Sequence, residues 1–118
     1  LARIEQAAEA LRRIDPEGSY TYNIGTIPLF VRGDVAAMLR HTRAWVERHD
    51  VPTAHGAFGA ALMFNGHFDE AARAQERALR LSPRDTFRAE WQYRLAMAHF
   101  AAGRHALARD WSLTAEQS

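Results

Sequence analysis

The sequence has no cysteine and no lysine. Without cysteine, the chain can form neither disulfides nor thiolate metal sites, and its redox environment stays open. All 15 residues in the Lys and Arg class are arginines, which we interpret as a compositional bias and not as a functional signal. They nearly balance 14 acidic residues, so the net charge is only +1. Such a small charge gives no electrostatic reason to expect nucleic acid or an anionic membrane as a partner.

Long apolar runs and strand-like patterns are missing as well. No segment approaches the ~18 apolar residues that a membrane span needs, and no signal peptide is visible. We therefore expect no membrane association and a cytoplasmic location. Stretches of β-branched residues are nearly absent, whereas the good helix formers Ala, Leu, Arg and Glu are frequent. Since the first residue is Leu1 and not Met, we also expect a fragment of a longer protein.

Glycines and prolines mark breaks between helical segments. These breaks predict seven helices, over about 2–14, 20–31, 34–49, 53–65, 68–81, 85–102 and 105–116. In the third and fifth segments, apolar side chains recur at the i, i+3, i+4, i+7 spacing of an amphipathic helix. Pro28 lies inside the second segment, where we expect a kink or a late start. The pattern predicts an all-α protein.

Three glycines divide the chain at similar intervals. Gly33, Gly66 and Gly103 each follow one helical segment and precede an Ala-containing segment, and they lie 33 and 37 residues apart. Recurring helix–turn–helix units of this length are typical of an α-solenoid. The alternative is an unrelated α-helical bundle with Ala-rich packing.

The segment Pro52–Asp85 resembles a tetratricopeptide repeat, a pair of antiparallel helices. The matching residues are Gly59, the turn residue Gly66, Ala71, Ala78 and the closing Pro83. Four further slots of the family pattern are filled by other residues: His55 stands in the Trp slot, Phe58 in the Leu slot, Leu62 in the Tyr slot and Gln75 in the aromatic slot of the second helix. The resemblance implies a single α-solenoid domain of about three repeats. Its parts are a partial repeat helix (1–16), a degenerate repeat (20–51), the best match (52–85) and a terminal repeat (86–118).

A narrower resemblance concerns the stretch ALRLSPRDTFRAEWQYRLAMAHFAAGRHALA. It is similar to repeat arrays found beside bacterial adenylate cyclase domains or the winged-helix domains of transcriptional regulators. This likeness implies a self-associating or structural element of a larger bacterial regulator or cyclase-like enzyme as the alternative role. The residues expected to self-associate are Ile4, Ala8 and Leu11 at one end of the chain, and Trp111 and Leu113 at the other.

The family resemblance implies a non-catalytic module that binds a protein partner, as a peptide or a helix, in a concave groove lined by the first helix of each repeat. The predicted groove residues are Asn23, Phe30, Met63, Phe64, Tyr93, Arg94, Met97 and Phe100, with Ile27, Thr53, Gly56, Ala60 and Glu90 beside them. Trp91 is expected to face away from this groove. Some family members clamp a C-terminal carboxylate with Lys, Asn and Arg. Here only Arg94 agrees, so we do not expect that type of recognition.

Motifs for catalysis, metals or cofactors are not found. Six histidines are present, but none gives two ligands one turn apart with a nearby carboxylate, and the HExxH pattern is absent. We expect His55 and His99 to replace aromatic packing residues, and the others to be solvated or near helix ends; these are His41, His49, His67 and His105. There is no nucleophile elbow and no phosphate-binding glycine loop. The sequence therefore predicts no enzyme activity, no metal and no cofactor.

Overall fold

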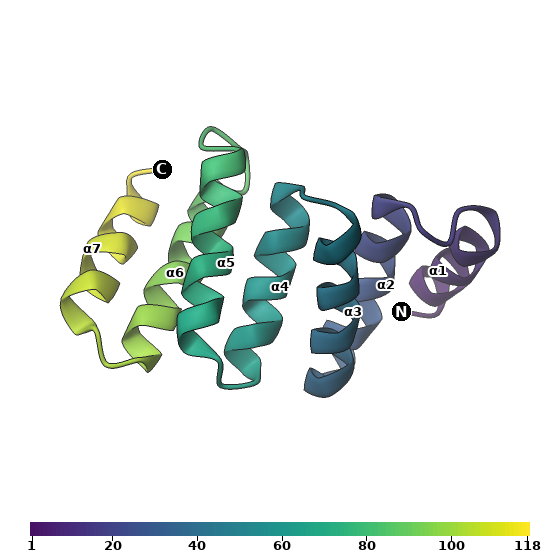
Figure 1. The fold of residues 1–118 in the computed structure, drawn as a ribbon, viewed down its shortest axis with the longest axis horizontal. Helices are drawn as coiled ribbons and strands as arrows, with labels where there is room; N and C mark the ends of the chain where they lie inside the picture. Colours follow the sequence, from purple (N-terminus) through teal and green to yellow (C-terminus); the bar gives the residue numbers. More distant parts are fainter.

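Seven α-helices and no strand make up the protein (Figure 1). The computed structural model describes residues 1–118. The helices are α1 (Ala2–Ile14), α2 (Ser19–Arg32), α3 (Val35–Arg48), α4 (Pro52–Phe64), α5 (Phe68–Leu81), α6 (Arg88–Ala101) and α7 (His105–Glu116). Each helix packs against the next one in sequence, as the units of a solenoid do. The predicted all-α class is confirmed.

Two helices differ from the sequence prediction for reasons that the structure shows. The first is α2, which starts at Ser19 and continues through Pro28 without interruption, so the expected late start is wrong. Pro28 is buried, and packing holds the helix despite the lost hydrogen bond. The second is α6, which starts three residues later than predicted, because the Asp85 carboxylate accepts hydrogen bonds from Ser82 Oγ at 3.0 Å and from the Phe87 amide at 2.9 Å. These bonds close a turn in the linker before α6.

The same turn joins α2 to α3, α4 to α5 and α6 to α7. At its centre lies Gly33, Gly66 or Gly103, with φ of 69°, 80° and 85°, a left-handed conformation that glycine adopts without strain. The residue after each glycine donates its amide hydrogen to the carbonyl five positions back, as in a Schellman motif. The bonds join Asp34 to Leu29, His67 to Leu62 and Arg104 to His99, at 3.2, 2.9 and 2.8 Å. The three turns are therefore structurally equivalent.

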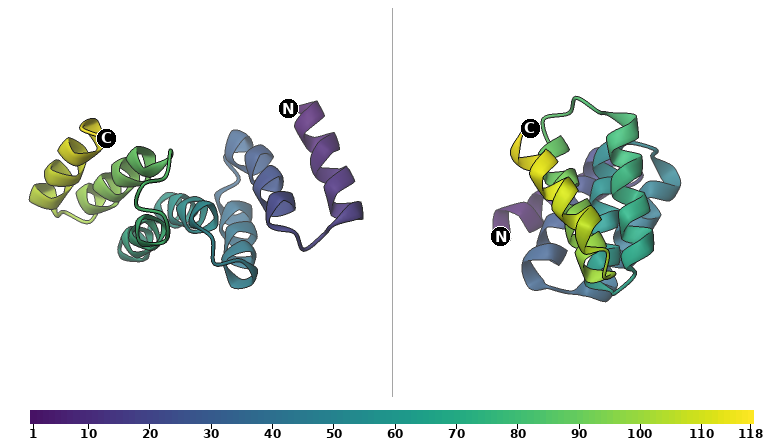
Figure 2. Two further views of the ribbon diagram at one scale, coloured as in Figure 1. Left: turned by 90° about the horizontal axis from the view of Figure 1, so that it is seen from above. Right: turned by 90° about the vertical axis from the view of Figure 1, so that its left-hand side faces the viewer.

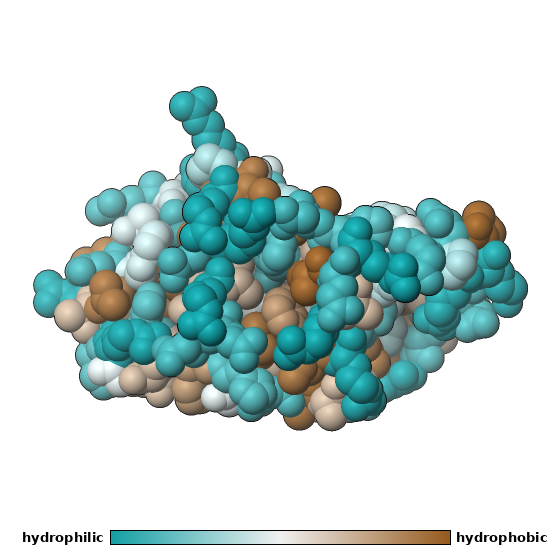
Figure 3. All heavy atoms as spheres, in the orientation of Figure 1, coloured by the Kyte–Doolittle hydropathy of each residue, from teal (hydrophilic) through white to brown (hydrophobic).

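Helices α2, α4 and α6 lie on the inner side of a curved array. Besides the contacts between sequence neighbours, α2 contacts α4 and α4 contacts α6, whereas α3, α5 and α7 touch only their sequence neighbours. Seen from above, the chain forms an arc with α3 and α5 on its outer side (Figure 2, left). That outer face is mostly hydrophilic (Figure 3). The charged residues of α5, among them Glu70, Arg73 and Arg80, are exposed to solvent.

Small residues of α4 allow it to approach two neighbouring helices closely. A Cβ atom added to Gly56 would lie 2.5 Å from Nε1 of Trp91 in α6. One added to Gly59 would meet the Gln75 side chain and lie 3.2 Å from the Ala71 carbonyl oxygen, both in α5. Between the three helices lies the core cluster of Leu62, Ala71, Ala72, Ala74, Leu95 and Ala98. Gly56, which was expected to face the groove, is therefore a buried packing residue.

We expect Gly56→Ala to lower the free energy of unfolding by about 1–2 kcal/mol, since overpacking against Trp91 outweighs the ~1 kcal/mol gain in helix propensity. Urea denaturation monitored by circular dichroism would measure the change. The control is Thr53→Ala on the exposed side of the same helix, which should stay within about 0.5 kcal/mol of the parent protein. A Gly56→Ala protein as stable as the parent would contradict the close-approach interpretation.

Candidate functional site

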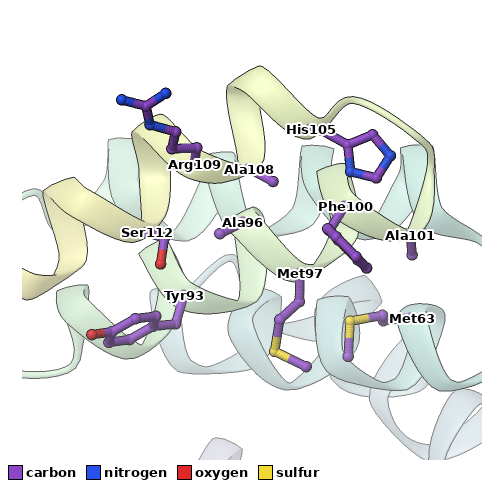
Figure 4. Close-up of a pocket in the computed structure, with 10 residues that line it drawn as sticks. All are labelled: Met63, Tyr93, Ala96, Met97, Phe100, Ala101, His105, Ala108, Arg109 and Ser112. Carbon is purple, nitrogen blue, oxygen red and sulfur yellow. The ribbon is translucent and has the colours of Figure 1, made fainter.

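Two hollows lie beside α6, one on each side of the helix. The first, which we call the inner groove, has a volume of about 320 Å³ and lies between α2, α4 and α6. Its walls include Asn23, Ile27, Phe30, Phe87, Glu90 and Arg94. The second, which we call the end pocket, has a volume of about 610 Å³ and lies between α6 and α7, with one residue from α4 (Figure 4). Its walls include Met63, Tyr93, Met97, Phe100, Arg109 and Ser112.

The predicted groove residues divide between these two hollows. Asn23, Phe30 and Arg94 line the inner groove, and Met63, Tyr93, Met97 and Phe100 line the end pocket. Phe64 lines neither hollow, but its exposed ring lies edge-on to the ring of Phe30, with 6.2 Å between the centroids. The structure thus separates residues that the sequence assigned to a single groove. The division falls between Tyr93 and Arg94, which are neighbours on α6 but face different hollows.

Arg94 is the central polar side chain of the inner groove. Its Nη1 donates to the Gly56 carbonyl at 3.2 Å, and its Nη2 donates to Glu90 at 2.7 Å, with 28% of the side chain exposed. These two bonds hold the guanidinium in one orientation, and Glu90 offsets its charge. Ile27 and Phe87 expose apolar surface around it. The groove therefore combines apolar contact surface with a fixed and largely compensated polar group.

Two aromatic residues of the inner groove were missed by the sequence interpretation. Trp91 was predicted to face away, but it lines the groove while remaining only 2% exposed, because its ring packs against Gly56. Phe87 was not considered, because a helix over 85–102 was expected there. The turn made by Asp85 instead places Phe87 immediately before α6 and at the edge of the groove. No local sequence signal would have located either side chain.

The end pocket contains residues of α7 that were also missed. His105, Arg109 and Ser112 form its α7 side, and the His105 ring lies edge-on to Phe100 with 4.9 Å between centroids. Figure 4 shows Tyr93 and Met97 along the opposite side, while the Arg109 side chain extends away from its neighbours. The prediction assigned binding only to the first helix of each repeat, so it did not consider the second helix of the last pair.

His99 is buried between α5, α6 and the final turn, as expected of a packing residue. Its Nδ1 accepts a hydrogen bond of 2.8 Å from Arg104 Nε, and Arg104 also pairs with Asp69. Burial of the imidazole, and then the positive charge of Arg104, lower the pKa of His99, although Glu76 and Asp69 act in the opposite direction. The folded protein therefore favours the neutral form of His99 more than the unfolded chain does.

The other histidines make local contacts that explain their presence. His55 is mostly buried and pairs with Asp50 at 2.7 Å. His49 lies at the C-terminal end of α3, as expected of a residue near a helix end, whereas His41 lies inside α3, where neither expected position holds. Both are half-buried, and each Nε2 donates at 2.7 Å to a backbone carbonyl at or just before α2. His67 and His105 were also expected to be solvated or near helix ends, and both are exposed. No three His, Asp or Glu side chains form a group that could hold a metal ion.

Lowering the pH from about 7.5 to about 5.5 should reduce the melting temperature, in part through His99. Because the pKa of His99 is lower in the folded state, the unfolded chain binds the proton first, and stability falls as the pH drops below the unfolded pKa. We expect His99→Gln to reduce this pH dependence. The matched variant His105→Gln, at an exposed position, should keep the parental dependence. Identical profiles for His99→Gln and the parent would contradict the assignment.

Comparison with known proteins shows the fold. No protein-family model matches the chain, and no curated protein matches it in sequence. A solved structure named MamA MSR-1 C2, a tetratricopeptide-repeat protein, superposes with a TM-score of 0.74 and 18% sequence identity. The match covers 98% of this chain and 67% of that one. The chain thus has a tetratricopeptide-like helical-repeat fold. None of its helices is long and apolar enough to cross a membrane.

Proposed function

We propose that this chain is a non-catalytic interaction module that binds a segment of a partner protein in its inner groove. The observation that carries the proposal is the convergence of three helices, α2, α4 and α6, on one hollow with an apolar margin and a fixed guanidinium. Helical-repeat folds of this kind generally present their concave surface to other proteins.

The chemistry of the inner groove favours a peptide with alternating apolar and polar groups. Ile27 and Phe87 offer exposed apolar surface for a partner's aliphatic or aromatic side chain. Asn23 and Thr53 are exposed polar residues of two different helices and can bond to a peptide backbone. Because Arg94 is already paired with Glu90, a terminal carboxylate would have to compete for it. We therefore expect an internal segment, not a free C-terminus, as the ligand.

The end pocket supports self-association as a second role. Tyr93, Met97 and Phe100 are exposed there as one apolar row on α6. Of the end residues expected to self-associate, Ala8 is buried and Trp111 packs against the core, whereas Leu113 is exposed. The wider context, a bacterial regulator or cyclase-like enzyme in the cytoplasm, rests on the sequence resemblance alone, since the comparisons give it no support.

Selection of peptides from a random display library, followed by fluorescence anisotropy, tests binding in the inner groove. We expect Phe87→Glu, alone or with Ile27→Glu, to weaken the selected peptides at least about tenfold, because a charge would be buried in the contact. Both positions are exposed, so the fold should tolerate the changes.

The matched control is Leu107→Glu, which adds the same charge at an exposed position of α7 outside both hollows. This variant should bind the peptides like the parent protein. If the inner-groove variants also bind them with unchanged affinity, or if no peptide is selected at all, the proposed function is wrong.

A further inference from the structure

The end pocket has an equivalent one repeat earlier in the chain. The turns at Gly66 and Gly103 have the same geometry and lie 37 positions apart, so each residue of α6 and α7 corresponds to one in α4 and α5. On this register Met97 corresponds to Ala60, Arg109 to Ala72, and Ser112 to Gln75.

The equivalent surface on α4 and α5 is covered by α6. Ala60 is 4% exposed, and Ala72 and Gln75 are also buried, with Ala72 in the same core cluster as Leu95 of α6. At the end pocket, by contrast, Met97 is 51% exposed, because none of the seven helices covers it. The end pocket is thus equivalent to a surface that, one repeat earlier, binds a helix. A helix seated there in the same way would run antiparallel to α7, as α6 runs antiparallel to α5 (Figure 1).

The free face of α7 has charges arranged for pairing with a copy of itself. Arg109 and Glu116 lie seven residues apart, which places them on the same side of the helix two turns apart. Neither side chain is in an ion pair within the chain, although eight such pairs form elsewhere. In an antiparallel pair of α7 helices related by a two-fold axis, Arg109 of each copy would face Glu116 of the other. The axis would pass between Ser112 and Leu113.

Size complementarity agrees with this pairing. Ser112 is small and half-buried, and Leu113 is 46% exposed beside it. About the same two-fold axis, Leu113 of each copy meets Ser112 of the other, so a large side chain packs against a small one. The exposed row of α6 that lines the pocket, which includes Tyr93 and Phe100, then lies beneath the second α7. An isologous contact must be self-complementary in this way.

We propose that the end pocket is a homodimer interface in which α7 of a second copy of this chain occupies the position that α6 holds on α4 and α5. The paired α7 helices run antiparallel, with two Arg109–Glu116 ion pairs across the axis. This interface is separate from the inner groove, so it does not depend on the proposed peptide binding.

A charge-exchange experiment on the whole chain tests the proposal by sedimentation velocity over a range of concentrations. Arg109→Glu alone would place acidic groups opposite each other, and Glu116→Arg alone would do the same with basic groups. We expect either change to raise the dimer dissociation constant about tenfold or more. The double variant, Arg109→Glu with Glu116→Arg, should restore dimerisation. A mixture of the two single variants should form a heterodimer, because each variant then supplies the charges that the other lacks.

A second, steric variant is Ser112→Arg, which should abolish the dimer by placing a long charged side chain at the axis. Leu107→Glu, on another side of α7, is the control and should dimerise normally. Circular dichroism and thermal melting verify that each variant folds. A monomeric parent protein at all concentrations would overturn the proposal. So would a dimer that is insensitive to Ser112→Arg, or one that the double charge exchange fails to restore.

Discussion

The close approach of α4 to α5 and α6 determines the geometry on which both hollows depend. At Gly56 the absence of a side chain leaves the backbone carbonyl open to other groups. Gln75 of α5 donates to this oxygen at 3.0 Å, and Arg94 of α6 donates to it at 3.2 Å. A single carbonyl therefore connects all three helices, and it joins the buried core to the polar group of the inner groove. A larger residue in place of Gly56 would displace Trp91 and with it the wall of the groove.

The two hollows differ in how far their polar groups are hydrogen-bonded and their apolar groups covered by the protein's own helices. In the inner groove, neighbouring helices surround a polar group whose hydrogen bonds are already made within the protein. In the end pocket, apolar side chains and Arg109, which has no ion pair within the chain, lie on a surface that none of the seven helices covers. The first is therefore a surface that a ligand can use without changing the protein's own contacts. The second is an exposed apolar surface, equivalent to the one that α6 covers on α4 and α5.

Ion pairs between the helices fix their relative orientation more than they increase the free energy of unfolding. Arg77 and His55 both contact Asp50, which ties the linker before α4 to α5, and Arg104 connects the last turn to Asp69. Asp50 and Asp69 are well exposed, and exposed pairs contribute on the order of 0–1 kcal/mol each. The burial of small and aliphatic residues between α4, α5 and α6 is the larger contribution.

Local patterns in the sequence were sufficient to predict the helices and the turns. Helix propensity, amphipathic spacing and the need for glycine at left-handed positions act over a few residues, so all seven helices and the three turns could be predicted. They also predicted the close-contact role of Gly59, which the structure confirms. Pro28 and Asp85 show the limit, because tertiary packing carried α2 through the proline and a side-chain turn delayed α6.

Only the tertiary structure decided which side chains share a hollow. Tyr93 and Arg94 line different hollows, although they are adjacent in the chain. The burial of Trp91 and the exposure of Arg109 depend on whether a neighbouring helix is present, which no short segment encodes. The sequence by itself thus determined the elements and their order, since these follow from local interactions. The structure decided the surfaces, since these follow from contacts between residues far apart in the chain.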